Sequence, residues 1–152
     1  MKEINRMELI IDSLSINESF ARSTVAAFAS LLNPTLEELG DLKTAISEAV
    51  TNCVVHAYAG EVGKIKILCT LYQEGIIHIK VSDSGCGIVN IAKALEPFYT
   101  TKPESERSGM GFTVMQSFMD TFKVEQNKDG GISVYLSKAF NSASISNLVK
   151  EG

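Results

Sequence analysis

The sequence lacks the features of several large classes of protein. Its three cysteines, Cys53, Cys69 and Cys86, show no C-x-x-C spacing and suggest neither a zinc motif nor a disulfide framework. No stretch is apolar over enough residues to span a membrane, and the N-terminus becomes charged before any run of signal-peptide length. We therefore expect a cytoplasmic protein.

Basic residues are also too few for a nucleic-acid-binding surface. The chain has 14 Lys and Arg against 18 Asp and Glu, a net charge of −4, whereas a phosphate backbone requires a basic face. A single bound nucleotide remains compatible with this balance, because it needs only local donors. The G-x-x-x-x-G-K-[ST] loop and the H-R-D and D-F-G kinase signatures are absent from the sequence.

The length and composition indicate one globular domain. The chain has 152 residues, of which 45% are hydrophobic and 21% are charged, enough for one continuous core. We expect this domain to occupy residues 1–140. Residues 141–152 form a serine-rich tail that is either disordered or not native to the protein.

Alternating apolar residues predict strands in three places. Met7, Leu9 and Ile11 alternate with mostly polar neighbours. The ranges 65–81 and 122–136 each show the pattern of a hairpin with a glycine-containing turn.

Helical periodicity predicts three helices between these strands. The first has Asn17 or Ser19 as its cap. The second opens with a T-x-x-E capping box at Thr35 and runs to about Tyr58. The third covers about 112–120.

The second helix carries the residues around which we expect the site to form. Glu48 and Asn52 are four residues apart and therefore project side by side from one face. A carboxylate and an amide oxygen are hard donors, suited to a proton and a magnesium ion. The buried face should lie elsewhere on the helix, along a stripe made of Leu39, Leu42, Ile46, Ala49, Val50 and Cys53. Alone, such a polar pair is more often a solvated helix face.

Asp83 lies an even number of residues after Val81 and Ile77, which face inwards in a predicted strand. Since side chains two residues apart share a face of a strand, we expect the Asp83 side chain to face inwards too. A carboxylate aimed at the interior needs a partner or a ligand. Asp83 also begins the sequence D-S-G-C-G, in which Gly85 and Gly87 let the backbone approach a flat base closely. Such a site is suited to accept a hydrogen bond from an exocyclic amino group.

The range 88–108 sustains neither period, and an irregular stretch of this length inside a compact domain is usually a functional lid. Gly109-Met110-Gly111 follows directly before the third helix, where backbone N–H groups can bind phosphate. These glycines lack the spacing of a dinucleotide fingerprint.

In chain order, the E-x-x-x-N helix, the D-x-G-x-G turn, the irregular stretch and the G-x-G before a helix resemble the GHKL ATPases. The resemblance covers about residues 35–138. It implies an α+β fold of the Bergerat type, a two-layer α/β sandwich whose mixed, mostly antiparallel sheet is covered on one face by helices. It also implies ATP or ADP and Mg²⁺ as cofactors.

Within that superfamily, the chain is similar to the bacterial anti-sigma factors that are also serine-protein kinases. Three stretches are very similar to those of spore-forming bacteria: S-E-A-V-T-N at 47–52, P-F-Y-T-T-K-P at 97–103 and E-R-S-G-M-G-F at 106–112. The resemblance implies a homodimer that sequesters a sporulation sigma factor and phosphorylates a serine of an anti-anti-sigma protein. The alternatives are a non-catalytic, ATP- or ADP-gated module that sequesters the sigma factor, and an ATPase fragment of a larger machine.

The resemblance also implies roles for residues of the first two motifs. Asn52 would bind Mg²⁺, and Glu48 would accept the proton of the attacking serine hydroxyl. Asp83 would hydrogen-bond to the adenine amino group, and Gly85 and Gly87 would line the base.

The later motifs would contact the phosphates. Four consecutive residues would wrap them: Ser108, Gly109, Met110 and Gly111. Arg107 would neutralise the transferring phosphoryl group or hold the protein substrate, unless it is a surface arginine paired with a nearby glutamate. Thr101 and Lys102 would contribute from the lid, with solvated loop residues as the alternative. Arg22 resembles an arginine of the family's first helix that helps to contact the sigma factor.

Overall fold

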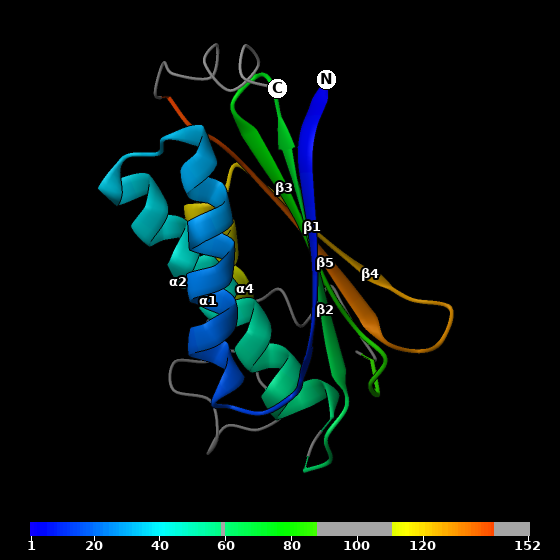
Figure 1. Ribbon diagram of the computed structural model, residues 1–152. Coiled ribbons are helices and arrows are strands. Elements are labelled where there is room, and N and C mark those ends of the chain that lie inside the picture. Colours follow the sequence, from blue (N-terminus) through cyan, green and yellow to red (C-terminus); the bar gives the residue numbers. More distant parts are fainter. Residues whose placement is uncertain (59, 88–110, 142–152) are drawn as a thin grey trace.

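A five-stranded sheet forms one layer of the protein and helices form the other (Figure 1). The computed structural model describes residues 1–58, 60–87 and 111–141. The strand order is β1-β2-β3-β5-β4, and every pairing between these strands is antiparallel. The strands are β1 (Glu3–Asp12), β2 (Lys64–Tyr72), β3 (Ile76–Asp83), β4 (Thr121–Gln126) and β5 (Ile132–Ala139). The predicted two-layer α+β architecture is confirmed.

The helix layer covers one face of the sheet, with α2 between α1 and α4 (Figure 1). α1 (Asn17–Ala29) continues into the short 3₁₀ helix η1 (Ser30–Leu32). α2 (Leu36–Asn52) continues into the π-helical η2 (Cys53–Ala57), and α4 spans Gly111–Phe118. No helix in the described part of the chain is long and apolar enough to cross a membrane.

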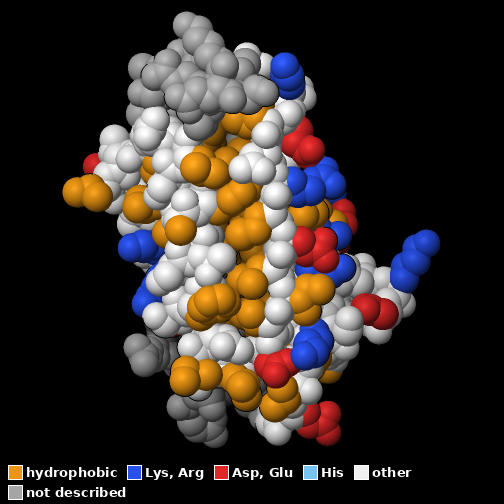
Figure 2. All heavy atoms as spheres, in the orientation of Figure 1, with side chains coloured by type: hydrophobic (Ala, Val, Ile, Leu, Met, Phe, Trp, Pro, Cys, Tyr) orange, Lys and Arg blue, Asp and Glu red, His pale blue; other side chains and the backbone are white. Residues whose placement is uncertain are grey.

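The core lies between the two layers, because alternate residues of each strand point towards the helices. The inward residues of the central strands are exposed by 2% or less, namely Ile65, Ile67, Cys69, Leu71, Ile77, Ile79 and Val81. Full burial of one such branched side chain contributes about 1.5–3 kcal/mol. At the sheet edge, Ile4, Met7 and Leu9 of β1 are only partly buried, whereas Ile11 is buried, and hydrophobic side chains form a stripe on this face of the molecule (Figure 2).

The N-terminus of α2 is capped as its sequence predicts. The Thr35 hydroxyl accepts a hydrogen bond from Glu38 N at 3.1 Å, and the Glu38 carboxylate accepts one from Thr35 N at 2.9 Å. This reciprocal pair satisfies two backbone donors that the first turn of a helix leaves free. The helix that carries Glu48 and Asn52 therefore has a well-defined start.

The predicted cap of α1 is wrong. Ile16 occupies the N-cap position, and no side chain accepts a hydrogen bond there. Asn17 is the first helical residue, and its side-chain amide donates to the Asp12 carbonyl at 2.9 Å. Asn17 thus ties the helix to the end of β1, because the nearby carbonyl competes successfully for its side chain.

Candidate functional site

α2 places Glu48 and Asn52 one turn apart, and both residues are partly buried. The predicted apolar stripe faces the core, since Leu42, Ile46, Ala49, Val50 and Cys53 are buried, whereas Leu39 is partly buried against it. Among the described residues, no side-chain hydrogen bond engages the Asn52 amide. An amide oxygen is a hard donor of the kind that Mg²⁺ accepts.

The helix widens into a π turn directly after Asn52. Single π turns inside helices occur frequently at functional sites. Here the turn directs two backbone carbonyls at the residue in the middle of the glycine loop: Ala57 O accepts from Cys86 N at 2.9 Å, and His56 O accepts from Cys86 Sγ at 3.3 Å. The end of the Asn52 helix is thus joined to the segment that follows Asp83.

Asp83 lies at the end of β3 with its side chain turned inwards, as counting by twos predicts, and it is 7% exposed. Its Oδ1 accepts hydrogen bonds from Gly85 N at 2.9 Å and from Ile132 N at 3.2 Å. Within the described part of the chain, its Oδ2 accepts only a long contact from the Cys53 thiol, at 3.7 Å. Burial raises the pKa of the Asp83 carboxyl, and the two backbone N–H donors act in the opposite direction.

The two carboxylate oxygens of Asp83 are therefore not equivalent. Oδ1 is saturated by backbone donors, whereas Oδ2 retains capacity to accept a stronger donor than a thiol. The contact from Cys53 also joins Asp83 to the residue that follows Asn52. From the sequence alone, Cys53 is predicted only to be buried, because nothing there indicates a partner 30 residues away.

The glycines after Asp83 allow the backbone of this loop to pack directly against the backbone of neighbouring segments. A Cβ at Gly85 would lie 2.2 Å from the Ala57 carbonyl oxygen. Gly87 has a φ of +75°, and a Cβ there would lie 2.3 Å from the Gly130 carbonyl oxygen. In the described structure, the close approach that these glycines permit is to protein backbone.

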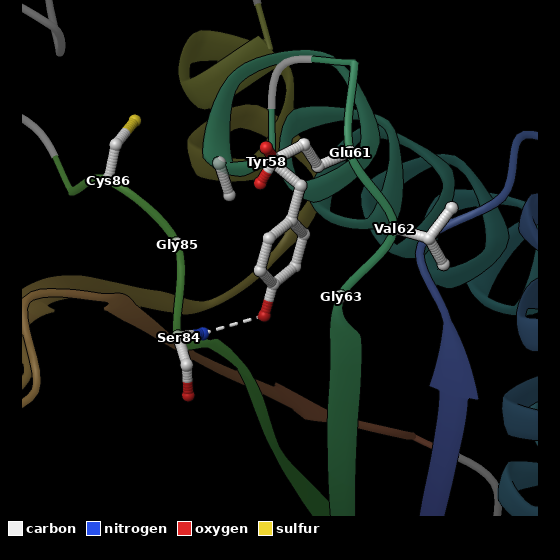
Figure 3. A pocket seen from close by; sticks show the side chains of 8 residues that line it. Tyr58, Glu61, Val62, Gly63, Ser84, Gly85 and Cys86 are labelled. Atoms are coloured by element: carbon white, nitrogen blue, oxygen red, sulfur yellow. Dashed lines mark hydrogen bonds between the residues drawn. The ribbon is translucent and has the colours of Figure 1, made fainter.

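A cavity of about 480 Å³ opens beside this loop (Figure 3). Ala57, Tyr58 and Glu61 line it from the helix end, and Ser84, Gly85 and Cys86 line it from the loop. Asn52 and Asp83 are not among its lining residues. The cavity is therefore adjacent to the predicted site and does not coincide with it.

The remaining predicted site residues fall into two groups. Thr101, Lys102, Arg107, Ser108, Gly109 and Met110 lie outside the described residues, as do the predicted lid at 88–108 and the tail after 141. Gly111 is the first residue of α4. Arg22 lies on α1, where its Nη1 donates to Glu18 Oε1 at 3.1 Å and to Ser47 Oγ at 3.3 Å. Arg22 thus contacts the residue that precedes Glu48.

The described residues fit a magnesium ion only in company with a phosphate ligand. Within residues 1–58, 60–87 and 111–141, no three His, Cys, Asp or Glu side chains form a cluster that could hold a metal by themselves. Magnesium commonly keeps several waters and binds through few protein groups plus phosphate oxygens. One amide oxygen from Asn52 fits that pattern.

Comparisons with known proteins agree with this architecture. Residues 15–138 match the family of the histidine kinase-like ATPase domain. The chain is 54% identical over 136 residues to the anti-sigma F factor of Clostridium acetobutylicum, a match that covers 90% of this chain and 94% of the relative. It is 53% identical over 140 residues to the anti-sigma F factor of Clostridium kluyveri, covering 92% and 98% of the two chains.

A solved structure shares the fold at much lower identity. The crystal structure of the RsbU and RsbW domains of a Mycobacterium tuberculosis protein superimposes with a TM-score of 0.64 at 18% identity. The match covers 90% of this chain and 33% of that one. At this identity the likeness concerns the fold alone.

Proposed function

Because the chain belongs to the anti-sigma F factors, a family with a histidine kinase-like ATPase domain, we propose that it is an ATP-dependent serine-protein kinase and anti-sigma factor. Its partners would be a sporulation sigma factor, which it sequesters as a homodimer, and an anti-anti-sigma protein, which it phosphorylates on serine. The cofactors would be ATP or ADP with Mg²⁺.

One observation supports this proposal most strongly, namely the contact between Cys53 and Asp83. It holds the helix that carries Glu48 and Asn52 against the loop that begins at Asp83. A nucleotide bound there would have its base near the carboxylate and its phosphates towards the helix.

The open Oδ2 of Asp83 is suited to the adenine amino group. Guanine presents a carbonyl at the corresponding position, so a carboxylate there would repel it and select ATP over GTP. Gly85 and Gly87 would line the base in addition to packing against the backbone. The buried, low-dielectric position of the carboxylate strengthens this hydrogen bond.

Glu48 and Asn52 would act at the other end of the nucleotide. The Asn52 amide oxygen would hold Mg²⁺, which when bound neutralises phosphate charge. Glu48 would accept the proton of the substrate serine hydroxyl as that oxygen bonds to the γ-phosphorus, while the bond from the γ-phosphorus to the bridging oxygen breaks and ADP leaves. Phosphoryl transfer depends mostly on positioning and charge neutralisation, so the base would supply only part of the rate.

The residues outside the described ranges complete the proposal. Arg107 would neutralise the transferring phosphoryl group or hold the protein substrate, and Thr101 and Lys102 would contribute from the lid. The phosphates would be wrapped by residues 108–111.

The test is phosphoryl transfer from labelled ATP to a candidate anti-anti-sigma protein. The Glu48→Gln variant should bind ATP normally and yield no or much less phosphoserine, because it loses the base but keeps the shape of the side chain. Glu37→Gln is the matched control, since Glu37 lies exposed in the first turn of the same helix.

One result would contradict the kinase proposal, and another would contradict the role of Glu48. If the unaltered protein binds ATP and a sigma factor but transfers no phosphate, the alternative of a nucleotide-gated binding module is supported. If Glu48→Gln transfers phosphate as fast as Glu37→Gln does, Glu48 is not the base.

A further inference from the structure

Tyr58 connects three segments of the chain that lie close to Asp83. Its hydroxyl donates a hydrogen bond to the Lys64 carbonyl at 2.6 Å and accepts one from Ser84 N at 2.8 Å. Figure 3 shows the ring extending from the end of the helix to the loop, with its oxygen facing the Ser84 nitrogen. One side chain thus joins the end of η2, the start of β2 and the residue after Asp83.

The ring of Tyr58 is held in place as well. A Cβ at Gly63 would lie 2.1 Å from the ring, so only glycine leaves room for it there. Burial raises the pKa of the Tyr58 hydroxyl, so the group keeps its proton near neutral pH. A protonated hydroxyl can donate and accept at the same time, which both of its contacts require.

The hydroxyl is one of several contacts that fasten the loop to the helix end. Cys86 N donates to the Ala57 carbonyl at 2.9 Å, and Gly85 packs against the same carbonyl. Ser84 N is the loop donor nearest to Asp83, and the Tyr58 oxygen is its acceptor. Removal of that acceptor takes away the link between Ser84 and the helix end, while the contacts further along the loop remain. Ser84 Oγ still donates to Asp129 Oδ2 at 2.9 Å, but that bond ties the loop to the turn between β4 and β5 and not to the helix.

From this arrangement we infer that Tyr58 is a positioning residue for nucleotide recognition. Together with the contact from Cys53, it holds Asp83 in place relative to the helix that carries Asn52, and so contributes to the affinity for ATP and to the preference for adenine. It acts through Asp83 and makes no contact with the nucleotide. The inference rests on the proposed nucleotide site.

The variant Tyr58→Phe removes one oxygen atom and keeps the ring against Gly63. We expect the affinity for Mg-ATP to fall about fivefold to tenfold, the effect of losing a hydrogen bond that holds a binding group in place. The affinity for Mg-GTP should change much less, because GTP makes no favourable contact with Asp83. The preference for ATP over GTP, given by the ratio of the two affinities, should therefore decrease.

Two control variants separate positioning from loss of stability. Tyr72→Phe removes a tyrosine hydroxyl on the opposite face of the sheet, where the Tyr72 ring packs edge-on against His78. Thr35→Ala removes the cap at the far end of α2 and lowers stability away from the site. Both should bind ATP and GTP with unchanged affinities when the fraction of folded protein is taken into account.

A double-mutant cycle tests whether Tyr58 acts through Asp83. In an Asp83→Asn background, Tyr58→Phe should weaken ATP binding no further, because the group that it positions is already lost. Calorimetric titration of the full chain with Mg-ATP and Mg-GTP measures all four proteins of the cycle.

The possible failures are distinguishable. If Tyr58→Phe binds ATP with the affinity and selectivity of the unaltered protein, or if its effect adds fully to that of Asp83→Asn, the positioning role is refuted and the nucleotide site stands. If the unaltered protein binds no adenine nucleotide, the proposed function fails and this inference fails with it.

Discussion

Replacement of Asp83 by asparagine separates the role of this residue in binding from its role in folding. The amide has one oxygen and one nitrogen in place of two equivalent oxygens. Because Gly85 N and Ile132 N both donate to Oδ1, the amide oxygen should take that position. The amide nitrogen then occupies the place of Oδ2, where it can donate to the Cys53 sulfur.

The structure allows the size of the binding defect to be estimated. The new N–H group would face the adenine amino group, so a charged acceptor is exchanged for a second donor. A hydrogen bond to a charged group contributes about 1.5–3 kcal/mol. We therefore expect Mg-ATP to bind roughly 10- to 150-fold more weakly.

The effect on folding should have the opposite sign near neutral pH. Burial raises the pKa of Asp83 in the folded protein, so as pH rises the unfolded chain loses this proton first. The contribution of Asp83 to stability is complete below the ordinary pKa of an aspartate and is lost as pH rises through the folded value. The asparagine variant has no such loss and should be at least as stable as the unaltered protein at pH 7.

Urea unfolding without nucleotide at several pH values, together with ATP titration at pH 7, tests this reasoning. The difference in unfolding free energy between variant and unaltered protein should become more favourable to the variant from pH 4 upwards. Unchanged ATP affinity would show that Oδ2 is not the adenine acceptor. A large loss of stability at pH 7 would show that the charge itself supports the fold.

Three shorter predictions follow from other contacts. Lys138→Met should lower the free energy of unfolding by about 1–2 kcal/mol, because the buried Lys138 Nζ donates a hydrogen bond to the last carbonyl of α4 at 2.9 Å. Asp41→Asn should lower it less, because the Asp41 carboxylate lies 3.8 Å from the same Nζ. Thr35→Ala should cost about 1 kcal/mol in urea unfolding, as a lost N-cap does. In the native protein only the exposed thiol of Cys86 should react rapidly with a thiol reagent, and Cys86→Ser should abolish that reaction. Cys53 and Cys69 are buried, and burial raises the pKa of both thiols, that of Cys69 to about 12.

Local patterns were sufficient to predict most of the fold. Alternation placed the inward residues of the strands correctly, and the same counting by twos placed Asp83 in the interior. The capping box located the start of α2. These features depend on residues close together in the chain, and burial of apolar area then enforces them.

One buried charge was missed although the same rule could have found it. Counting by twos along β5 from Ile132 reaches Val134, Leu136 and then Lys138, which is 8% exposed. A lysine at the end of an apolar row is readily taken for the exposed end of a strand. Lys138 is buried against the C-terminus of α4, and the sequence does not indicate that this helix end lies beside β5.

The contacts that assemble the site depend on tertiary structure and were not predictable. The π turn at 53–57 has no distinctive sequence, because each of its residues also suits an ordinary helix. The bonds from Tyr58 and Cys53 reach residues 26 and 30 positions away. Periodicity predicts which face of an element is buried, but it cannot predict which polar groups meet across two elements.

The burial of Asp83 has a consequence for how folding and ligand binding are connected. A carboxylate in the interior destabilises the empty protein at neutral pH, and among the residues that the structure describes, a thiol is the only donor to its Oδ2. A ligand that donates an N–H group to Oδ2 supplies a stronger hydrogen-bond partner. Part of its binding free energy therefore comes from offsetting the unfavourable free energy of burying the Asp83 carboxylate. A loop held by few contacts could shift and expose such a carboxylate to water, which would remove this unfavourable free energy without a ligand. The several bonds that fix residues 84–86 to the helix end prevent such relaxation, and they keep the acceptor in place for the nucleotide.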